Sequence, residues 1–255
     1  MRSVLQLLRL LPVYVFLYLP IAVLVVFAFN DSKYSVAWKG FTWKWFGRLL
    51  ENTQLMDAAL NSLTVAVLSA TAATMLGVLA SVALYRYRFR GKQIMQSVLF
   101  ILMVSPDIVM GVALLVLFMF IGLKPGFLTL LLAHTTFCLP FVTVTVSSRL
   151  AGFDGHLIEA AQDLGAGEFQ AFRHVLLPML LPAVVAGWLL SFTLSMDDVI
   201  ISFFVTGPEF DILPLRVYSM VRLGVKPDVN ALSAIMFGLT VVIVFTSQLL
   251  LRRKR

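Results

Sequence analysis

Long runs of apolar residues, separated by short polar segments, dominate this chain. A helix rises about 1.5 Å per residue, so about 20 apolar residues cross the hydrocarbon core of a bilayer. Six stretches reach that length, and they are residues 10–29, 58–85, 94–122, 127–148, 179–205 and 229–251. Isolated strands would leave backbone groups unpaired in lipid, so the pattern predicts an all-α membrane protein with six transmembrane helices. We expect residues 1–255 to form a single transmembrane domain.

The amino-acid composition excludes a soluble globular protein. Apolar residues make up 60% of the 255 positions and charged residues 13%, whereas soluble domains carry about 45–50% and about 25%. So few charges cannot supply the polar surface that a soluble domain of this length needs. Arg2 and Arg9 precede the first stretch, as in a signal peptide. That stretch is too long for a signal peptide and no clear cleavage site follows, which favours a retained helix.

The distribution of basic residues predicts the orientation. Lysine and arginine gather in cytoplasmic loops of membrane proteins. If the N-terminus lies in the cytoplasm, twelve of the 20 basic residues fall on that side. They are Arg2, Arg9, Arg86, Arg88, Arg90, Lys92, Arg149, Arg173 and the tail Arg252, Arg253, Lys254 and Arg255. We therefore expect both termini in the cytoplasm.

The longest cytoplasmic connection, residues 150–177, carries a predicted helix. Asp154 is a plausible N-cap and Gly165 a plausible stop. Between them Leu157, Ala160, Ala161 and Leu164 follow the i, i+3, i+4, i+7 spacing of one apolar face. A second helical stretch, Glu168–Leu177, leads to Pro178. The residues alone leave two interpretations open, a docking surface for another protein or a helix lying on the membrane.

Three acidic residues lie inside the predicted spans, which contain no lysine or arginine away from their ends. An acid at the bilayer centre costs roughly 2.5–3.5 kcal/mol on insertion scales, so it needs compensation or a function. Pro106 should kink the third span next to Asp107, and Asp197 and Asp198 lie in the outer half of the fifth. They are either hydrogen-bonded structural residues or the lining of a path for a cation. Acids without bases favour cations over anions.

Aromatic faces attract ammonium groups, so an outer mouth of the path is expected at Trp45 and, less directly, Tyr18. An ion-coupled secondary transporter remains an alternative use of membrane acids. An intramembrane aspartyl protease lacks its expected motifs.

The chain is expected to bind neither ATP nor a metal. A phosphate-binding loop requires glycines before a lysine and a hydroxyl after it, and here Gly91-Lys92 is followed by Gln93. ATP hydrolysis is therefore assigned to a separate chain. The three histidines are dispersed and form no metal site. We expect His134 to be a hydrogen-bonding interior residue.

The cytoplasmic connection resembles the EAA signature of ABC importer membrane subunits. Glu159-Ala160-Ala161, Gly165 and Val175-x-Leu177-Pro178 keep the spacing of that signature. The resemblance implies the type I (MetI-like) transmembrane fold and a non-catalytic transport subunit. In that family the segment forms a coupling helix that docks in a groove of the ATPase. Glu159, Ala160, Ala161, Gly165 and Pro178 would serve this coupling, and Glu168 is a possible further ATPase contact.

Four further stretches, residues 83–92, 105–110, 134–141 and 190–198, resemble the shorter permease subunit of bacterial spermidine/putrescine importers. The resemblance implies a polyamine permease in the bacterial inner membrane. Its implied partners are a second permease, two ATPase subunits that use ATP and magnesium, and a periplasmic substrate-binding protein. No cofactor bound by this chain is implied. The alternative is a permease for another small organic solute or cation.

Overall fold

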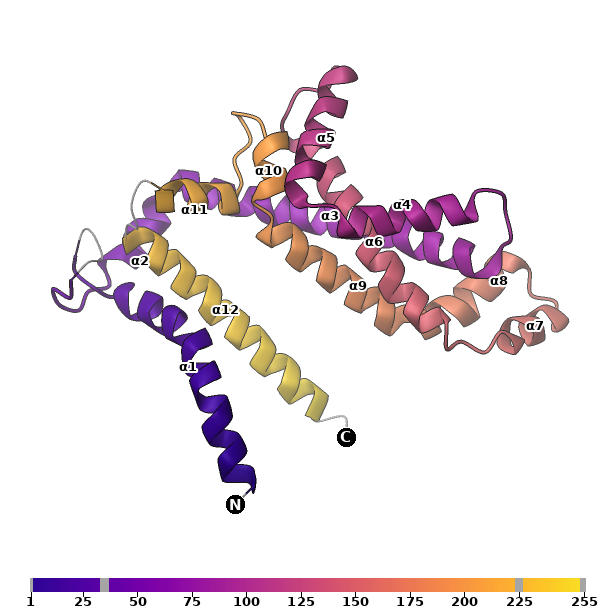
Figure 1. The fold of residues 1–255 in the computed structure, drawn as a ribbon, viewed down its shortest axis with the longest axis horizontal. Coiled ribbons are helices and arrows are strands. Elements are labelled where there is room, and N and C mark those ends of the chain that lie inside the picture. Colours follow the sequence, from indigo (N-terminus) through magenta and orange to yellow (C-terminus); the bar gives the residue numbers. More distant parts are fainter. Residues whose placement is uncertain (1, 33–36, 223–226, 253–255) are drawn as a thin grey trace. The chain divides into compact units, whose positions relative to one another are not determined.

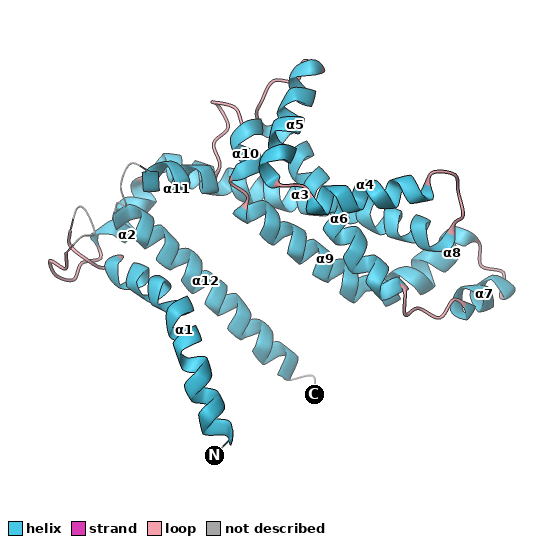
Figure 2. Ribbon diagram, viewed as in Figure 1, coloured by secondary structure: helices cyan, strands magenta, loops and turns pink. Residues whose placement is uncertain are grey.

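The computed structural model describes residues 2–32, 37–222 and 227–252, with side chains described within 10–32, 37–222, 227–238 and at 241, and its regular structure is helical. Figure 1 shows the helices in chain order: α1 (Arg2–Phe27), α2 (Lys44–Glu51), α3 (Thr53–Arg86), α4 (Lys92–Val104), α5 (Asp107–Phe120), α6 (Phe127–Leu150), α7 (His156–Asp163), α8 (Glu168–Ala171), the π-helix η1 (Phe172–Leu176), α9 (Leu177–Asp197), α10 (Ile200–Val205), α11 (Leu213–Arg222) and α12 (Pro227–Arg252). Figure 2 shows loops between them and no strand in the described part of the chain, where Asn30 and Phe41 form one isolated bridge. The predicted all-helical class is confirmed.

The chain divides into two compact units. The first contains residues 1–57 and 216–255, and here α1 and α2 each pack against α12. Asn30 fixes the segment after α1, because its side chain donates to Ala37 O and accepts from Lys39 N, both at 2.8 Å. Phe29, Phe41 and Trp43 form an aromatic cluster beside it. This segment therefore folds around a fully buried asparagine.

The second unit, residues 58–215, is built around α6. This helix packs extensively against α9 and also contacts α4, α5 and α10. Leu130, Ala133, Val142 and Val146 on α6 are completely buried. α5 and α10 pack against each other as well. The side chains of α6 therefore form the centre of this unit's core. The candidate site lies on the helices that surround α6.

Within the described residues, four helices are long and apolar enough to cross a membrane. They are Leu10–Phe27, Thr53–Arg86, Phe127–Leu150 and the continuous helix Glu168–Asp197. The pair α4 and α5 qualifies as a fifth crossing if the two helices count together. The sixth predicted span, residues 229–251, falls within α12, whose side chains are described only at its beginning.

The third predicted span, residues 94–122, is not one helix. α4 ends at Val104 and α5 begins at Asp107, and the two helices meet at 116°. Ser105 and Pro106 are extended, with ψ angles of 135° and 136°. A proline disfavours the helical conformation of the residue before it, which ends the first helix. The predicted disturbance at Pro106 is present, but it is larger than a kink. The helix ends, and a second helix begins in another direction.

The fifth predicted span, residues 179–205, is also interrupted. α9 continues only to Asp197, Asp198 is extended with ψ 125°, and α10 begins at Ile200. The expectation that Asp197 and Asp198 lie within a continuous helix is wrong. They lie at a helix break, where backbone groups are available for polar interactions.

Two glycines allow α3 and α9 to approach α6 closely. A Cβ atom added at Gly77 would lie 2.8 Å from Val142 Cβ, and one added at Gly187 would lie 3.2 Å from Val142 Cγ1. Ser81 Oγ donates to Thr143 O at 2.8 Å and so joins α3 to α6. Small residues permit such close packing of helices in membranes. Val142 is thus held between two glycines on different helices.

We predict that Gly77→Val destabilises the chain by about 1–3 kcal/mol, because the added side chain collides with Val142 on a neighbouring helix. Thermal unfolding of the purified transporter in detergent measures the effect. Gly47→Ala in α2 is the matched control, because nothing lies within 4 Å of a Cβ added there. Equal melting temperatures for the Gly77→Val variant and the native chain would contradict the close α3–α6 packing.

Candidate functional site

Three acidic residues expected in the membrane line one cavity. Asp107, Asp197 and Asp198 all border a pocket of about 340 Å³ in the second unit. The pocket lies at both helix breaks, since Asp107 starts α5 and Asp197 ends α9. Met110, Phe137 and Leu194 are among its apolar walls, and no lysine or arginine lines it in the described part of the chain. The cavity therefore has acidic groups on an apolar wall.

Asp198 uses its carboxylate to cap the start of α10. Its Oδ1 accepts from Ile201 N at 3.2 Å, and its Oδ2 accepts from Ser202 N at 2.7 Å. Ser202 Oγ also donates to Oδ2 at 2.7 Å. The Asp198 side chain is only 7% exposed. Its carboxylate thus satisfies backbone donors that the break leaves without helical partners.

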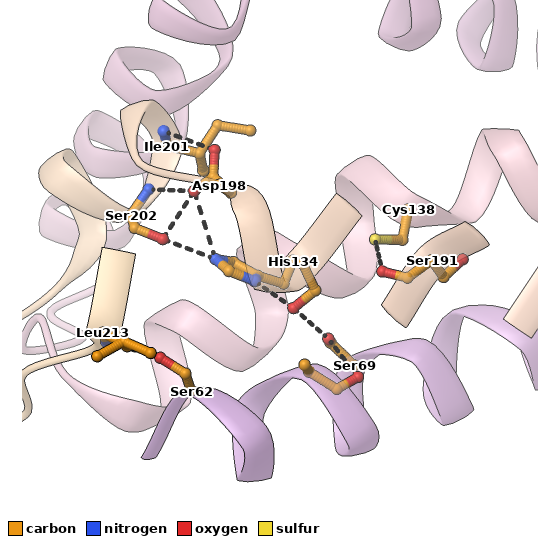
Figure 3. Close-up of polar contacts among 11 residues, drawn as sticks. Ser62, Ser69, His134, Cys138, Ser191, Asp198, Ile201, Ser202 and Leu213 are labelled. Carbon is orange, nitrogen blue, oxygen red and sulfur yellow. Dashed lines mark hydrogen bonds and ion pairs between the residues drawn. The ribbon is translucent and has the colours of Figure 1, made fainter. Parts of the chain in front are cut away.

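His134 on α6 connects this cap to α9 and α3 (Figure 3). His134 Nε2 lies 2.9 Å from Ser202 Oγ and 3.5 Å from Asp198 Oδ2, and Nδ1 lies 2.7 Å from Ser195 Oγ. Ser69 Oγ on α3 donates to Ser195 Oγ at 3.1 Å. With the His134 proton on Nε2, each of the three serine hydroxyls in this network, Ser69, Ser195 and Ser202, has an acceptor. The expectation that His134 is a hydrogen-bonding interior residue is confirmed, since the residue is 1% exposed.

Asp107 and Asp197 differ from Asp198 in having free carboxylates. Among the residues that the structure describes, neither has a hydrogen-bond or ion-pair partner, and both are exposed at the cavity. At the α4–α5 break, Pro106 has no N–H, and Ser105 Oγ donates to Ile101 O at 2.7 Å. No side chain in the described part of the chain caps the start of α5, where Val109 N and Met110 N donate to Pro106 O at 2.9 and 3.1 Å, so the Asp107 carboxylate is not used as a cap. Two acids remain available to a ligand.

Trp45 and Tyr18 lie in the first unit, on α2 and α1 respectively. The indole Nε1 of Trp45 donates to Asn30 O at 2.8 Å, and the residue is 5% exposed. Arg48 and Lys44 lie 5.1 Å and 5.6 Å from the ring centroid, so the chain's own cations occupy its faces. Tyr18 is exposed and stacks on Tyr14. Their place in a path stays a prediction.

The predicted cytoplasmic helix is present as α7. Asp154 Oδ1 accepts from His156 N at 3.0 Å, and Gly165 follows the helix with φ +88°. Ile158 anchors α7 because it is buried, and Ala161 is half-buried. The rest of the predicted apolar face points outward, with Leu157 41% and Leu164 90% exposed. Glu159 and Ala160 are exposed as well, and Pro178 lies in the first turn of α9.

The first turn of α7 contains an exposed ion pair. His156 Nδ1 lies 3.1 Å from Glu159 Oε2. The hydrogen bond to Glu159, together with the charges of Asp154 and Glu159, raises the pKa of His156 above its ordinary value. Glu159 is thus already engaged within its own helix.

The end of α3 holds the segment around α7 from both sides. Arg86 Nη2 lies 3.1 Å from Glu168 Oε1, and Tyr87 OH donates to Glu168 Oε2 at 3.1 Å. On the other side of α7, Tyr85 OH donates to Phe153 O at 3.4 Å. We call these contacts of Tyr85, Arg86 and Tyr87 the α3 clasp. The residues before the predicted coupling helix and after it are therefore tied to one transmembrane helix.

Comparison with known families identifies the chain. Residues 73–254 match the family described as binding-protein-dependent transport system inner membrane component. The chain belongs to this family. It is an inner-membrane transport component with several apolar helices.

Two curated relatives cover nearly the whole chain. The spermidine/putrescine transport system permease protein PotC of Escherichia coli K12 is 57% identical over 242 residues, covering 95% of this chain and 92% of the relative. The putrescine transport system permease protein PotI of the same organism is 42% identical over 259 residues, covering 99% and 92%. These relatives are permease subunits rather than enzymes, in agreement with the expected non-catalytic role.

The fold also matches a solved ABC transporter. A chain from the crystal structure of a bacterial transporter involved in importing the acidic polysaccharide alginate superposes with a TM-score of 0.79. The alignment covers 96% of this chain and 95% of that chain at 16% identity. At that identity the likeness shows the fold, and the expected ABC importer permease fold is confirmed.

Sequence reasoning missed how the acids divide their tasks. The capping role of Asp198 had a local signal, because Ser202 follows at i+4, where its N–H and hydroxyl can donate to the carboxylate. The contact of His134 with this cap joins residues 68 positions apart, and the Arg86–Glu168 pair joins residues 82 apart. No periodicity in the sequence reports such contacts.

We predict that Asp198→Ala lowers the stability of the chain by about 2–4 kcal/mol, the sum of a lost helix cap and unpaired buried partners. Asp197→Ala, next to it, should change the free energy of unfolding by no more than about 0.5 kcal/mol, because its carboxylate is free. Thermal unfolding of the detergent-solubilised transporter measures both. Similar losses for the two variants would refute the division of roles.

We predict that exchanging the charges of Arg86 and Glu168 distinguishes their contact within the α3 clasp from a contact of Glu168 with another partner. Arg86→Glu places two carboxylates together and should weaken transport for each ATP hydrolysed, whereas Arg86→Glu/Glu168→Arg should restore most of that ratio. The direct coupling energy of such a partly exposed pair is about 0.2–1 kcal/mol. Substrate uptake and ATP hydrolysis are measured together in proteoliposomes. A double variant as defective as Glu168→Arg alone would assign Glu168 to another partner.

Proposed function

We propose that this chain is one of two membrane subunits of an ATP-driven importer of the polyamines spermidine and putrescine, and that Asp107 and Asp197 bind the ammonium groups in passage. The supporting observation is the cavity in which both free carboxylates meet. A polyamine carries several ammonium groups along an apolar chain. Carboxylates on an apolar wall complement that pattern, and the absence of a lining base among the described residues disfavours an anion.

The relatives support the choice of substrate. The names of PotC and PotI specify spermidine with putrescine and putrescine alone, and their alignments cover 95% and 99% of this chain. A cavity that holds an acid at each of two helix breaks suits a ligand with separated positive groups.

The coupling role is proposed for α7. Its outward face, Leu157, Ala160 and Leu164, is exposed and unoccupied by the described part of the chain. We propose that this face docks in a groove of a separate ATPase, with Glu159, Ala160, Ala161, Gly165 and Pro178 shaping the segment. Glu159 would exchange His156 for an ATPase group, since its present partner lies on the same helix.

The proposed assembly contains this chain, a second permease, two ATPase subunits that use ATP and magnesium, and a periplasmic binding protein. We propose six membrane crossings with both termini in the cytoplasm, in which α4 with α5 forms the third and α9 with α10 the fifth. The orientation is supported by the basic cluster at residues 86–92 and the basic tail. No cofactor is proposed for this chain itself.

We predict that Asp107→Asn reduces polyamine uptake about 10-fold to 100-fold, the effect of losing one charged hydrogen-bond acceptor for a desolvated ammonium group. Uptake of labelled spermidine and putrescine is measured in proteoliposomes that contain the complete transporter and its binding protein. Competition by unrelated cations in the same assay tests the substrate class.

The controls separate passage from folding. Asp107→Glu retains the charge and should keep much of the uptake, and Asp31→Asn removes an exposed acid outside the cavity. The Asp107→Asn transporter should still assemble and hydrolyse ATP. Normal uptake by this variant would remove Asp107 from the path, and efficient uptake of a different solute in place of polyamines would overturn the substrate.

A further inference from the structure

A second pocket lies in the loop between α3 and α4. Its volume is about 570 Å³, and the residues that line it include Arg88, Arg90, Lys92, Gln93, Ile94 and Gln96. No acidic residue lines it in the described part of the chain. The pocket therefore gathers three cations and two amide donors, a set suited to an anion with several oxygen acceptors.

The cations of this pocket are not used elsewhere in the described structure. The preceding Arg86 is engaged by Glu168, whereas Arg88, Arg90 and Lys92 have no ion-pair partner among the described residues. Three like charges in a short loop repel one another unless an anion lies between them. The arrangement thus favours a bound anion more strongly than a single surface lysine does.

An apolar face leads away from the pocket along α4. Ile94 lines the pocket and is 70% exposed, and Val98 and Ile101 follow at i+4 and i+7 with exposures of 48% and 59%. These positions lie on one side of the helix. The basic pocket continues directly into an exposed apolar stripe. This combination matches a molecule with an acidic head and hydrocarbon tails.

We propose that this pocket binds the headgroup of an anionic phospholipid, with Arg88, Arg90 and Lys92 on the phosphate and an acyl chain along Ile94, Val98 and Ile101. Basic pockets at the cytoplasmic ends of membrane helices bind such headgroups. Arg86 is adjacent in sequence to the pocket and belongs to the α3 clasp, so the lipid sits next to the contacts that hold the predicted coupling segment. This site is independent of the polyamine assignment.

The test uses the complete transporter, purified in detergent and exposed to equal amounts of phosphatidylglycerol and phosphatidylcholine. Native mass spectrometry counts the lipids retained. The native chain should retain phosphatidylglycerol preferentially, and Arg88→Gln/Arg90→Gln/Lys92→Gln should reduce that preference about 100-fold. The control Arg252→Gln/Arg253→Gln/Lys254→Gln removes the same charge from the tail and should keep the preference.

Two further arms establish that the ligand is a lipid. Arg88→Lys/Arg90→Lys changes the same two arginines but retains their charges, and it should keep the preference. The loss in the glutamine variant would then follow from the removed charge and not from altered side-chain shape. Ile94→Asn/Ile101→Asn should weaken retention with the charges intact. Equal loss in the tail control, no preference in the native chain, or displacement of the lipid by equimolar inorganic phosphate would overturn the proposal. Cross-linking of the α4 stripe to the second permease without retained lipid would overturn it as well.

Discussion

A helix that stops in an apolar environment exposes backbone amides that must find other partners, and the second unit depends on how this requirement is met. At the start of α10 the Asp198 carboxylate accepts two of these amides and the Ser202 hydroxyl. His134 then links the cap to Ser195, and Ser69 links Ser195 to α3. The hydrogen-bond network that begins at the Asp198 carboxylate thus joins α10, α6, α9 and α3.

The two helix breaks solve the same problem differently, and the difference determines which acids are free. At the start of α5 no side chain of the described residues caps the helix, and Val109 N and Met110 N donate to Pro106 O. The Asp107 carboxylate makes no cap and lines the cavity. At the other break one aspartate caps the helix and its neighbour, Asp197, faces the cavity. Of two adjacent aspartates, one thus caps a helix and the other keeps a free carboxylate at the cavity.

Hydropathy and spacing predicted the helical class and most helix positions, because apolar length is a local property of the sequence. α6 and α3 were expected nearly where they occur. Pro106 indicated a disturbance in the third span but not its size, since a proline restricts the preceding residue without fixing the turn that follows. The second break carried no proline, and only the i+4 relation of Asp198 and Ser202 signals it. The candidate acids were predicted, but their meeting in one cavity depends on long-range packing that periodicity does not encode.

The two glycines that enclose Val142 constrain how this molecule moves. Because Gly77 and Gly187 have no side chain, α3 and α9 lie against Val142 of α6, and we expect sliding along one another to be opposed, since closely packed interiors resist gradual deformation. We therefore expect displacement of the segment fastened to the end of α3 to move these three helices together. α5 and α10 pack against each other, and the contacts of His134 with Asp198 and Ser202 tie α10 to α6, so both short helices belong to the same packed group.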